Sequence, residues 1–400
     1  MKQGWIAGVA IIALGLNVSC VSTEIQPSEV VRQVEQSSVV DPILEQNSAV
    51  DPILAKRGTI NPFLAWNQKA GRTGNRYGLT WTANPQRSNY RQNEPIIRLT
   101  ELYWSYYYPN KGWLDYPGIE PYLTSRNWGH AAEYGTTLAT NINSPDFLRH
   151  IASVGAANVQ SSNAHGVMLD WWHDNHQGGF SESAVRTARQ RLVRELRGAL
   201  GQDAIIIGNV NWRRDTATVS QINGVFLELY KSPYDRRSNS LYTSSELFEM
   251  ESLLRYYDER LAYPRLIALE GWRQTKAVSD ADRNTPANRR MAKIITAMSV
   301  VIPANGYILY GDNNPDTPVG DHDHLYYDFY NFDVGQPTSG YNSVSRGVGF
   351  KEHDRGVVAY NLTGRDFVFE TSDGREVTAP ANSGLFCEFV GDEERCLSPD

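Results

Sequence analysis

Between Gly166 and Asp312 the sequence repeats one arrangement: a short apolar run ends on a polar residue, and a helical pattern follows. The apolar runs are continuous rather than alternating, as in strands buried on both faces of a parallel sheet. The segments between them carry apolar residues at helical spacing, as in the predicted helix 181–200. Strands that alternate with helices predict βαβ units around a parallel sheet.

Five consecutive predicted strands end on polar side chains. The clearest is Gly166–Leu169, which is followed by Asp170 and then by Trp171 and Trp172. A (β/α)8 barrel gathers the carboxyl ends of its strands around one opening, where enzymes with this fold keep their active sites. We therefore predict an α/β fold, a (β/α)8 TIM-type barrel, with the strand-end groups in one ring around a shared pocket. The later strands end on Asn209 with Asn211, Glu228, Glu270 and Asp312.

A doubly wound open sheet is the alternative fold. It is disfavoured because no glycine-rich phosphate-binding loop follows any of these strands. The net charge of −7 provides no basic surface for nucleic acid, so a nucleic-acid partner is not expected.

The N-terminal residues 1–20 are predicted to be an export signal. Lys2 precedes an apolar core that is too short for a permanent membrane span, and small residues precede Cys20. This cysteine resembles the lipidated cysteine of bacterial lipoproteins. The protein is therefore expected to be exported, either as a lipoprotein anchored to the membrane through Cys20 (periplasmic or cell-surface) or as a secreted protein.

Residues 21–58 are polar and are predicted to form an extended tether. They contain a repeat, because Val40–Leu44 and Val50–Leu54 both have the sequence Val-Asp-Pro-Ile-Leu, and a degenerate third copy follows at Ile60–Leu64. A docking motif for a partner is the alternative interpretation of this repeat.

The folded body is predicted to consist of two parts. Residues 59–335 are expected to form the catalytic barrel, and residues 336–400, where strand patterns alternate with turns, a small antiparallel β-domain. Cys387 and Cys396 lie close together in that domain, and after export they could form a disulfide. Three cysteines are too few for a thiolate zinc site, and no metal or cofactor is predicted.

Several segments resemble a hypothetical glycosyl hydrolase family that is grouped with the α-galactosidase and endo-α-polygalactosaminidase barrels. The residues that carry this resemblance are Gly166–Trp172, Gly224–Glu228, Asp328–Tyr330 with Asp333–Pro337, and Gly347–Phe350 with Arg355–Asn361. The resemblance implies a glycoside hydrolase that cleaves an extracellular or cell-surface polysaccharide. In such barrels the acid that ends the fourth strand is the nucleophile or its equivalent, and the acid that ends the sixth is the acid/base. By position these are Asp170 and Glu228.

Glycoside hydrolysis usually needs two carboxyl groups that flank the scissile bond. Asp170 and Glu228 are predicted to lie two strands apart, so their backbones are separated by roughly 10 Å. This spacing is compatible with both the retaining and the inverting geometry, whereas carboxyls much further apart would favour binding over catalysis. Glu270 is the rival acid, and all of these acids could instead cap the helix that follows.

The remaining candidates are expected to bind the sugar. Aromatic rings stack on pyranose rings, so the tryptophans after strand ends are predicted to wall the cleft. Polar groups are expected to hydrogen-bond hydroxyls, and the aromatic cluster 103–108 is expected to be mainly core, although its first residue could reach the site. The predicted substrate-binding residues are Trp171, Trp172, Trp212, Trp272, His173, Asn209, Asn211, Asp312, Glu101 and Tyr103.

Two other functions remain open. His173-Asp174-Asn175-His176 and Asp321-His322-Asp323-His324 resemble metal-binding segments, and a metal-dependent polysaccharide deacetylase could use His173 and His176 with Asp170. The other alternative is a carbohydrate-binding surface lipoprotein without catalytic activity.

Overall fold

The computed structural model describes residues 50–66, 76–82, 95–108, 118–127, 137–175, 178–231, 241–274, 278–313, 322, 324–391 and 393–397. Contacts divide the chain into two units, Met1–Glu35 and Gln36–Asp400, and all of the described residues belong to the second. The expected export signal, Cys20 and the first copy of the repeat lie outside the described residues. Among the helices that are described, none combines the length and hydrophobicity needed to span a bilayer.

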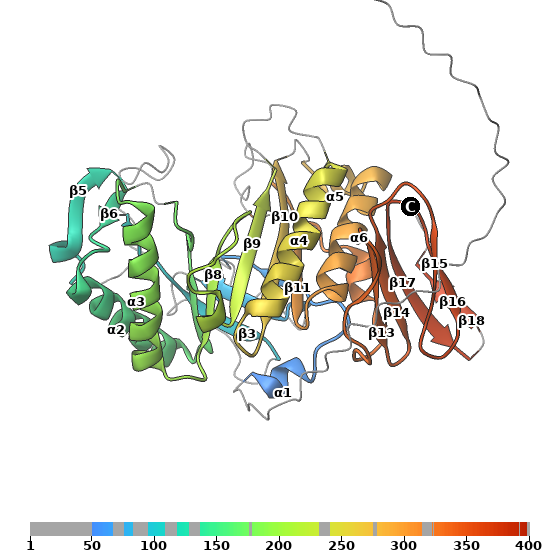
Figure 1. Cartoon of the computed structure of the whole chain (residues 1–400), viewed down its shortest axis with the longest axis horizontal. Coiled ribbons are helices and arrows are strands. Elements are labelled where there is room, and N and C mark those ends of the chain that lie inside the picture. Colours follow the sequence, from blue (N-terminus) through green and yellow to red (C-terminus); the bar gives the residue numbers. More distant parts are fainter. Residues whose placement is uncertain are drawn as a thin grey trace, which may run out of the picture. The chain divides into compact units, whose positions relative to one another are not determined.

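The centre of the molecule is a parallel sheet (Figure 1). In the described part of the chain it has eight strands, in the order β1-β2-β3-β7-β8-β9-β10-β11. A parallel bridge between Pro62 and Ile308 joins the two edges, and the Ile308 N–H donates to the Asn61 carbonyl at 2.9 Å. The sheet therefore closes on itself, and the predicted barrel is confirmed. Its strands are β1 (Phe63–Leu64), β2 (Leu79–Thr82), β3 (Ile97–Leu102), β7 (Gly166–Leu169), β8 (Ile205–Asn209), β9 (Gly224–Tyr230), β10 (Leu266–Gln274) and β11 (Gly306–Asn313).

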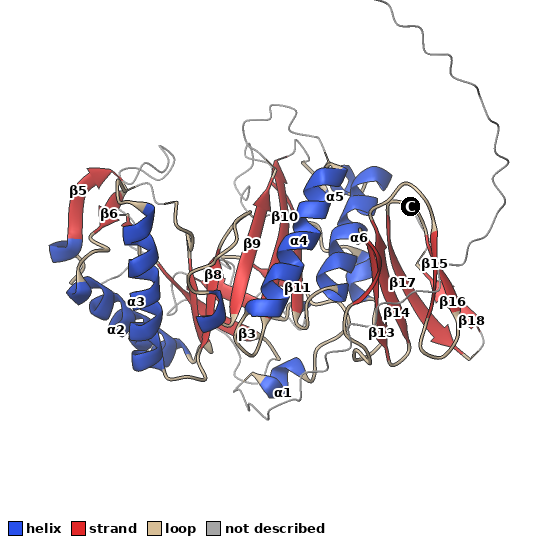
Figure 2. Cartoon of the chain, in the orientation of Figure 1, coloured by secondary structure: helices blue, strands red, loops and turns tan. Residues whose placement is uncertain are grey.

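Helices cover the outside of this sheet (Figure 2). Each of the four long helices begins with a serine or threonine N-cap, whose side-chain oxygen accepts a hydrogen bond from a free main-chain N–H of the first turn. These N-cap residues are Ser144, Ser181, Thr243 and Thr285. At the start of α4, Thr243 and Glu246 form a capping box, in which each side chain accepts a hydrogen bond from the main-chain N–H of the other residue. Between β8 and β9 the connection has only the 3-10 helix η4 (Val219–Gln221). The helices are α2 (Pro145–Ser162), α3 (Glu182–Leu200), α4 (Ser244–Arg260), α5 (Asp280–Arg283) and α6 (Pro286–Val301).

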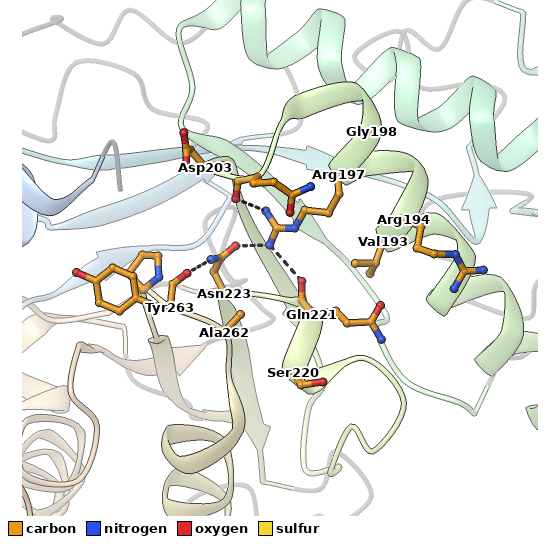
Figure 3. A pocket seen from close by; sticks show the side chains of 12 residues that line it. Val193, Arg194, Arg197, Gly198, Asp203, Ser220, Gln221, Asn223, Ala262 and Tyr263 are labelled. Carbon is orange, nitrogen blue, oxygen red and sulfur yellow. Dashed lines mark hydrogen bonds between the residues drawn. The ribbon is translucent and has the colours of Figure 1, made fainter. Parts of the chain in front are cut away.

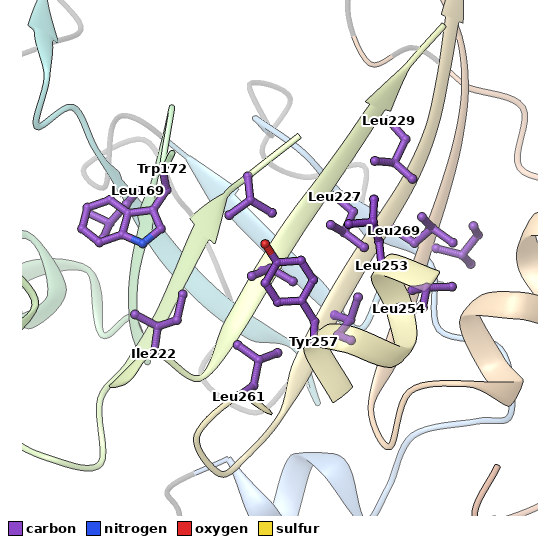
Figure 4. Close-up of a cluster of buried hydrophobic side chains, with 14 of the residues drawn as sticks. Leu169, Trp172, Ile222, Leu227, Leu229, Leu253, Leu254, Tyr257, Leu261 and Leu269 are labelled. Atoms are coloured by element: carbon purple, nitrogen blue, oxygen red, sulfur yellow. The ribbon is translucent and has the colours of Figure 1, made fainter. Parts of the chain in front are cut away.

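Side chains on the outer face of the strands pack under the helices. Figure 4 shows this layer, with Leu227 and Leu269 from β9 and β10 near Leu253 and Tyr257 of α4, and with Leu169 of β7 beside Trp172. All of these side chains are fully buried. A second cluster fills the barrel interior, and it includes Leu99, Met168, Ile207, Phe226 and Ala268.

Two smaller sheets and a hairpin complete the described chain. A three-stranded sheet follows β3 and contains β4 (Tyr106–Tyr107), η3 (Glu120–Tyr122) leading into β5 (Leu123–Asn127), and β6 (Leu138–Thr140). After the 3-10 helix η5 (Asp328–Asn331), the C-terminal region forms antiparallel strands. These are β12 (Asn342–Ser345), β13 (Val348–His353), β14 (Gly356–Asn361), β17 (Ser383–Val390) and β18 (Glu393–Cys396) in one sheet, and β15 (Phe367–Glu370) with β16 (Glu376–Ala379) in a hairpin.

The C-terminal β-domain is attached to the barrel through α6, which packs against β11 on one side and against β14 and β17 on the other. The buried Lys351 strengthens this contact, because its Nζ donates to the carbonyls of Val300 and Pro303 at 2.8 and 2.6 Å. A disulfide joins Cys387 and Cys396, the two cysteines that the sequence pairs.

The predicted tether included residues 50–58, and for these residues the prediction is wrong. Residues from Val50 onward pack on the barrel, with Val50 fully buried in the interior cluster and Asp51–Leu54 forming the short helix α1. The sequence does not predict this contact because residues 21–58 are polar on the whole. The apolar side chains that make the contact all come from one short segment, Val50–Leu54.

Candidate active site

The alternation of side chains along each strand decides which polar groups enter the barrel. Leu99, Met168, Ile207, Phe226 and Ala268 all face the interior. The residues two positions further along the same strands share this inward face and lie at the carboxyl ends. They are Glu101, Asp170, Asn209, Glu228 and Glu270.

Asp170 is held by three neighbouring side chains. Its Oδ2 accepts from the Tyr106 hydroxyl at 2.6 Å, and its Oδ1 accepts from Nδ2 of Asn209 at 2.9 Å. The indole N–H of Trp104 donates to its main-chain carbonyl at 2.9 Å. With 7% of its surface exposed, Asp170 is a fixed carboxylate that still reaches the opening.

The amide of Asn209 joins Asp170 to Glu228. Its Nδ2 also donates to Oε2 of Glu228 at 2.8 Å, while its Oδ1 accepts from the main-chain N–H of Asn211. Because one nitrogen contacts both carboxyls, the two accepting oxygens lie less than about 6 Å apart. The side chain of Glu228 keeps one fifth of its surface exposed, 20%, whereas Glu101 and Glu270 are fully buried.

The position of Glu228 favours its protonated form. Burial and, to a smaller extent, the neighbouring Glu270 and Asp170 carboxylates raise the pKa of this carboxyl to about 8, against the opposing effects of His322 and the Asn209 hydrogen bond. Glu228 therefore carries a proton at neutral pH. A carboxylic acid beside a fixed carboxylate is the pair that general-acid chemistry requires.

Glu270 is paired with a histidine that the sequence does not place in the site. Nδ1 of His322 lies 3.0 and 2.9 Å from the two oxygens of Glu270, and Nε2 lies 3.9 Å from Oε1 of Glu228. The imidazole packs at a tilt of 33° against the Trp66 ring, with 4.4 Å between ring centroids. We read this pairing as the reason why Glu270 is the weaker candidate for the acid. The only sequence signal for His322 is the Asp321-His322-Asp323-His324 segment, which resembles a metal-binding segment.

Glu101 belongs to the same ring. Burial and the Asp170 charge raise the pKa of this carboxyl well above its ordinary value, while the nearby Trp66 and Tyr103 side chains lower it. The buried Tyr103 stacks edge-on against Tyr106, 5.1 Å away, so it contacts the residue that holds Asp170. Glu101 and Tyr103 are therefore buried neighbours of the Asp170 site.

Asp312 does not join the ring, and this part of the prediction is wrong. It shares the strand face of Ile308 and Tyr310, which belong to the outer core under the helices. Its Oδ1 accepts from Nε of Arg273 and its Oδ2 from Nδ2 of Asn288, both at 2.6 Å. Asp312 is therefore the buried partner of an arginine on the outside of the barrel.

The prediction that Trp172 walls the cleft is also wrong. It is fully buried, its indole N–H donates to Thr218 at 2.9 Å, and its ring packs edge-on against Trp104. Adjacent residues face in different directions, so the ring that follows Trp171 lies in the core and has no surface for a sugar.

The other predicted aromatic residues retain accessible surface. Trp171, Trp212 and Trp272 are each partly exposed. Trp171 lies edge-on to His173, with 5.3 Å between centroids, and the Trp212 indole donates to the Tyr230 carbonyl at 3.0 Å. Stacking on a sugar by these three rings stays a prediction, as does hydroxyl binding by His173 and Asn211.

The described residues bring three metal-ligating groups together in two places. One is Glu228, Glu270 and His322, whose ligand atoms lie within 4.8 Å of one another, and the other contains the disulfide cysteines with Glu394. His173 belongs to neither group, so the described part of the chain does not assemble the predicted deacetylase site around it. His176, Asp321 and Asp323 lie outside the described residues.

A hollow of about 790 Å³ lies away from the carboxyls, where α3 ends and β9 and β10 begin. Figure 3 shows that Arg197 crosses it and bonds to Asn223 and to the Gln221 carbonyl. This guanidinium also binds the carbonyls of Gln202 and Ala204. Its donors serve to tie chain segments together at the amino-terminal end of the barrel, opposite the site.

No family model and no curated protein matches the chain. Among solved structures the chain is similar to the glycoside hydrolase domain of PelA from Pseudomonas aeruginosa, with 12% identity, 67% of this chain and 100% of that chain covered, and a TM-score of 0.45. It is similar to Amy13B of Eubacterium rectale, with 12% identity, coverage of 84% and 98%, and a TM-score of 0.48. It is also similar to Aspergillus fumigatus Ega3 in complex with galactosamine, with 8% identity, coverage of 57% and 86%, and a TM-score of 0.38.

Proposed function

We propose that the chain is a glycoside hydrolase that acts with retention of configuration, with Asp170 as nucleophile and Glu228 as acid/base. The observation that supports this most directly is the Asn209 amide, which holds one oxygen of each carboxyl within hydrogen-bond distance of a single nitrogen. Retaining enzymes have carboxyls about 5–5.5 Å apart, and inverting enzymes need about 6.5–9.5 Å to admit a water. The bound of about 6 Å favours the retaining geometry. It also favours catalysis over a binding protein without activity.

The reaction follows from the protonation states. In the first step an oxygen of Asp170 attacks the anomeric carbon, the glycosidic C–O bond breaks, and Glu228 gives its proton to the leaving oxygen. The product is a glycosyl ester on Asp170 and a free alcohol. In the second step Glu228, now ionised, takes a proton from water, the water oxygen bonds to the anomeric carbon, and Asp170 leaves as the carboxylate.

The surrounding residues keep these two roles distinct. The Tyr106 hydroxyl and the Asn209 amide both donate to Asp170, which favours its ionised form. The charges of Asp170 and Glu270 favour the protonated form of Glu228. Pairing with His322 keeps Glu270 from acting as a second free acid beside Glu228.

The substrate is proposed to be a polysaccharide outside the cytoplasm, which the enzyme reaches after export and, in the lipoprotein form, while anchored through Cys20. Trp171, Trp212 and Trp272 are the rings proposed to stack on sugar units, because each follows an inward-facing strand end and retains exposed surface.

The test is a screen of purified protein against α- and β-linked polysaccharides and aryl glycosides, with Asp170→Asn as the blank. We expect turnover by the wild type and none by the variant, while both melt at similar temperatures. NMR of the first-formed sugar should show the anomer of the substrate. Turnover by Asp170→Asn at the wild-type rate would refute the assignment, and an inverted first product would refute the nucleophilic role.

A further inference from the structure

The repeated Val-Asp-Pro-Ile-Leu motif plays no part in the proposed reaction. Its second copy, Val50–Leu54, is described and lies against the barrel. Figure 1 shows α1 at the end of the molecule opposite to the arrowheads of β9 and β10. The motif therefore binds at the amino-terminal mouth of the barrel, far from the carboxyl ends of the strands that hold the catalytic groups.

We call the part of the barrel mouth that contacts Val50–Leu54 the seat. The residues of the motif itself make the contacts there. Val50 is fully buried in the interior cluster, and Ile53 and Leu54 pack against the same cluster. The Asp51 carboxylate accepts from the Tyr263 hydroxyl at 2.9 Å. Pro52 lies in the first turn of α1, where its fixed φ suits the helix, and the N–H groups of Ile53 and Leu54 both donate to the Val50 carbonyl.

The first copy, Val40–Leu44, has the same five residues, and a serine precedes each copy by two positions. Directly after the motif, the main-chain N–H of Ala55 donates to the Asp51 carbonyl. Glu45 occupies the corresponding position after the first copy, and its main-chain N–H can make the same bond. The seat therefore offers the same contacts to both copies.

An exchange of one copy for the other would leave the rest of the body in place. Arg57 is anchored independently, since its guanidinium donates to the Ala304 carbonyl and its own carbonyl accepts from Gln336. Seating Val40–Leu44 lengthens the connection to Arg57 by the ten residues that separate the copies. The entropy of closing a loop grows only slowly with its length, so this change is small beside the contacts retained.

We propose that the amino-terminal mouth of the barrel is a binding seat for the Val-Asp-Pro-Ile-Leu motif, and that residues 40–44 of the same chain occupy it in exchange with residues 50–54. The exchange changes by ten residues the length of chain between the N-terminal segment and the barrel. Ten residues of extended chain correspond to roughly 35 Å of additional reach for whatever holds the N-terminal segment.

Photocrosslinking of the full chain tests which copy is seated. Tyr263 is 48% exposed and contacts Asp51 through its hydroxyl, so p-benzoylphenylalanine in its place would react with the bound segment at the cost of that hydrogen bond. In the otherwise wild-type chain we expect crosslinks to residues 48–54 and to residues 38–44, mapped by mass spectrometry. With Val50→Asp, crosslinks to residues 38–44 should increase at least about tenfold relative to those at residues 48–54, since an unpaired carboxylate is disfavoured in the apolar cluster.

Melting temperatures give an independent readout. Val40→Asp and Val50→Asp should each melt close to the wild type, whereas the double variant should melt about 2 °C or more below either, because neither copy can then bury its valine. Val34→Asp combined with Val50→Asp is the matched control, since Val34 lies in the same segment outside the repeat, and it should behave like Val50→Asp alone.

Three results would overturn the proposal. The first is loss of all crosslinks in Val50→Asp, and the second is a melting temperature for Val50→Asp that already equals that of the double variant. The third is a crosslink to residues 38–44 found only in a species of twice the mass, which would assign the seat to a second copy of the chain.

Discussion

Replacing Glu228 by glutamine tests the acid/base assignment most sharply. The pKa of about 8 means that at pH 7 the wild-type side chain is protonated in roughly ten molecules for each one in which it is ionised. The amide has the shape and charge of that protonated acid, so the free energy of unfolding at pH 7 should change by less than about 1 kcal/mol. The proton needed by the leaving group is lost, and turnover should fall by about 10²–10⁴.

The assay compares substrates that differ in their need for the acid. The dinitrophenolate group of a dinitrophenyl glycoside leaves without being protonated. Glu228→Gln should therefore retain most of its glycosylation rate on this substrate and lose that rate on an alkyl glycoside or a polysaccharide. Wild-type turnover should also fall as the pH rises through about 8, because the acid then ionises, and this fall should be absent in the variant. Glu270→Gln is the matched control, since it makes the same change one strand away.

The assignment fails if Glu228→Gln loses both classes of substrate equally and keeps the alkaline fall in rate. It also fails if Glu270→Gln, rather than Glu228→Gln, spares the dinitrophenyl substrate. The stability of the protein gives a further check. Between pH 4.5 and about 8 the folded state holds a proton on Glu228 that the unfolded state has lost, so the free energy of unfolding contributed by this group falls as the pH rises through that interval. Glu228→Gln should remove this slope in urea titrations.

Three further changes separate catalytic from structural groups. Asn209→Ala removes the donor shared by both carboxyls, so kcat should fall about 10–100-fold in steady-state assays with little change in melting temperature beyond the lost packing; unchanged kcat would contradict the bridging role. Asp312→Asn leaves the buried Arg273 charge without its carboxylate, so urea unfolding should show a loss of about 3–5 kcal/mol while kcat per folded molecule is retained; a selective loss of kcat would restore the sequence prediction. Lys351→Met leaves two carbonyls without their donor and should cost about 1–3 kcal/mol. Burial lowers the pKa of Lys351 to about 7, so between about 7 and 10.5 only the unfolded state holds this proton, and the deficit of the variant should grow as the pH rises through that interval.

The order of elements and the identity of the main acids are determined by local sequence. Continuous apolar runs that alternate with helical patterns are sufficient to predict the barrel, because each pattern reflects the burial of its own element. The strand ends follow directly, and with them Asp170, Asn209, Glu228 and Glu270. The helix start at Thr243 is equally local, since its capping box lies within four residues.

The direction of each strand-end side chain is decided only by the tertiary structure. A strand that is buried on both faces is apolar at every position, so its sequence contains no alternation that would distinguish the inward face from the outward face. Asp312 therefore looks like the other strand-end acids, yet it lies outside the barrel beside Arg273. The same ambiguity separates Trp171 from the buried Trp172.

Contacts between distant segments are the other part that sequence patterns cannot supply. His322 lies 52 residues from Glu270 in the chain, and the pairing of β10 with β11 brings the segment after β11 close to that carboxylate. The Asn209 amide likewise meets Glu228 because two strands pair side by side. The sequence by itself determined which acids end the strands of this barrel. The packing of those strands decided which of them share a pocket, because side-chain direction and long-range proximity are properties of the closed sheet and not of any one segment.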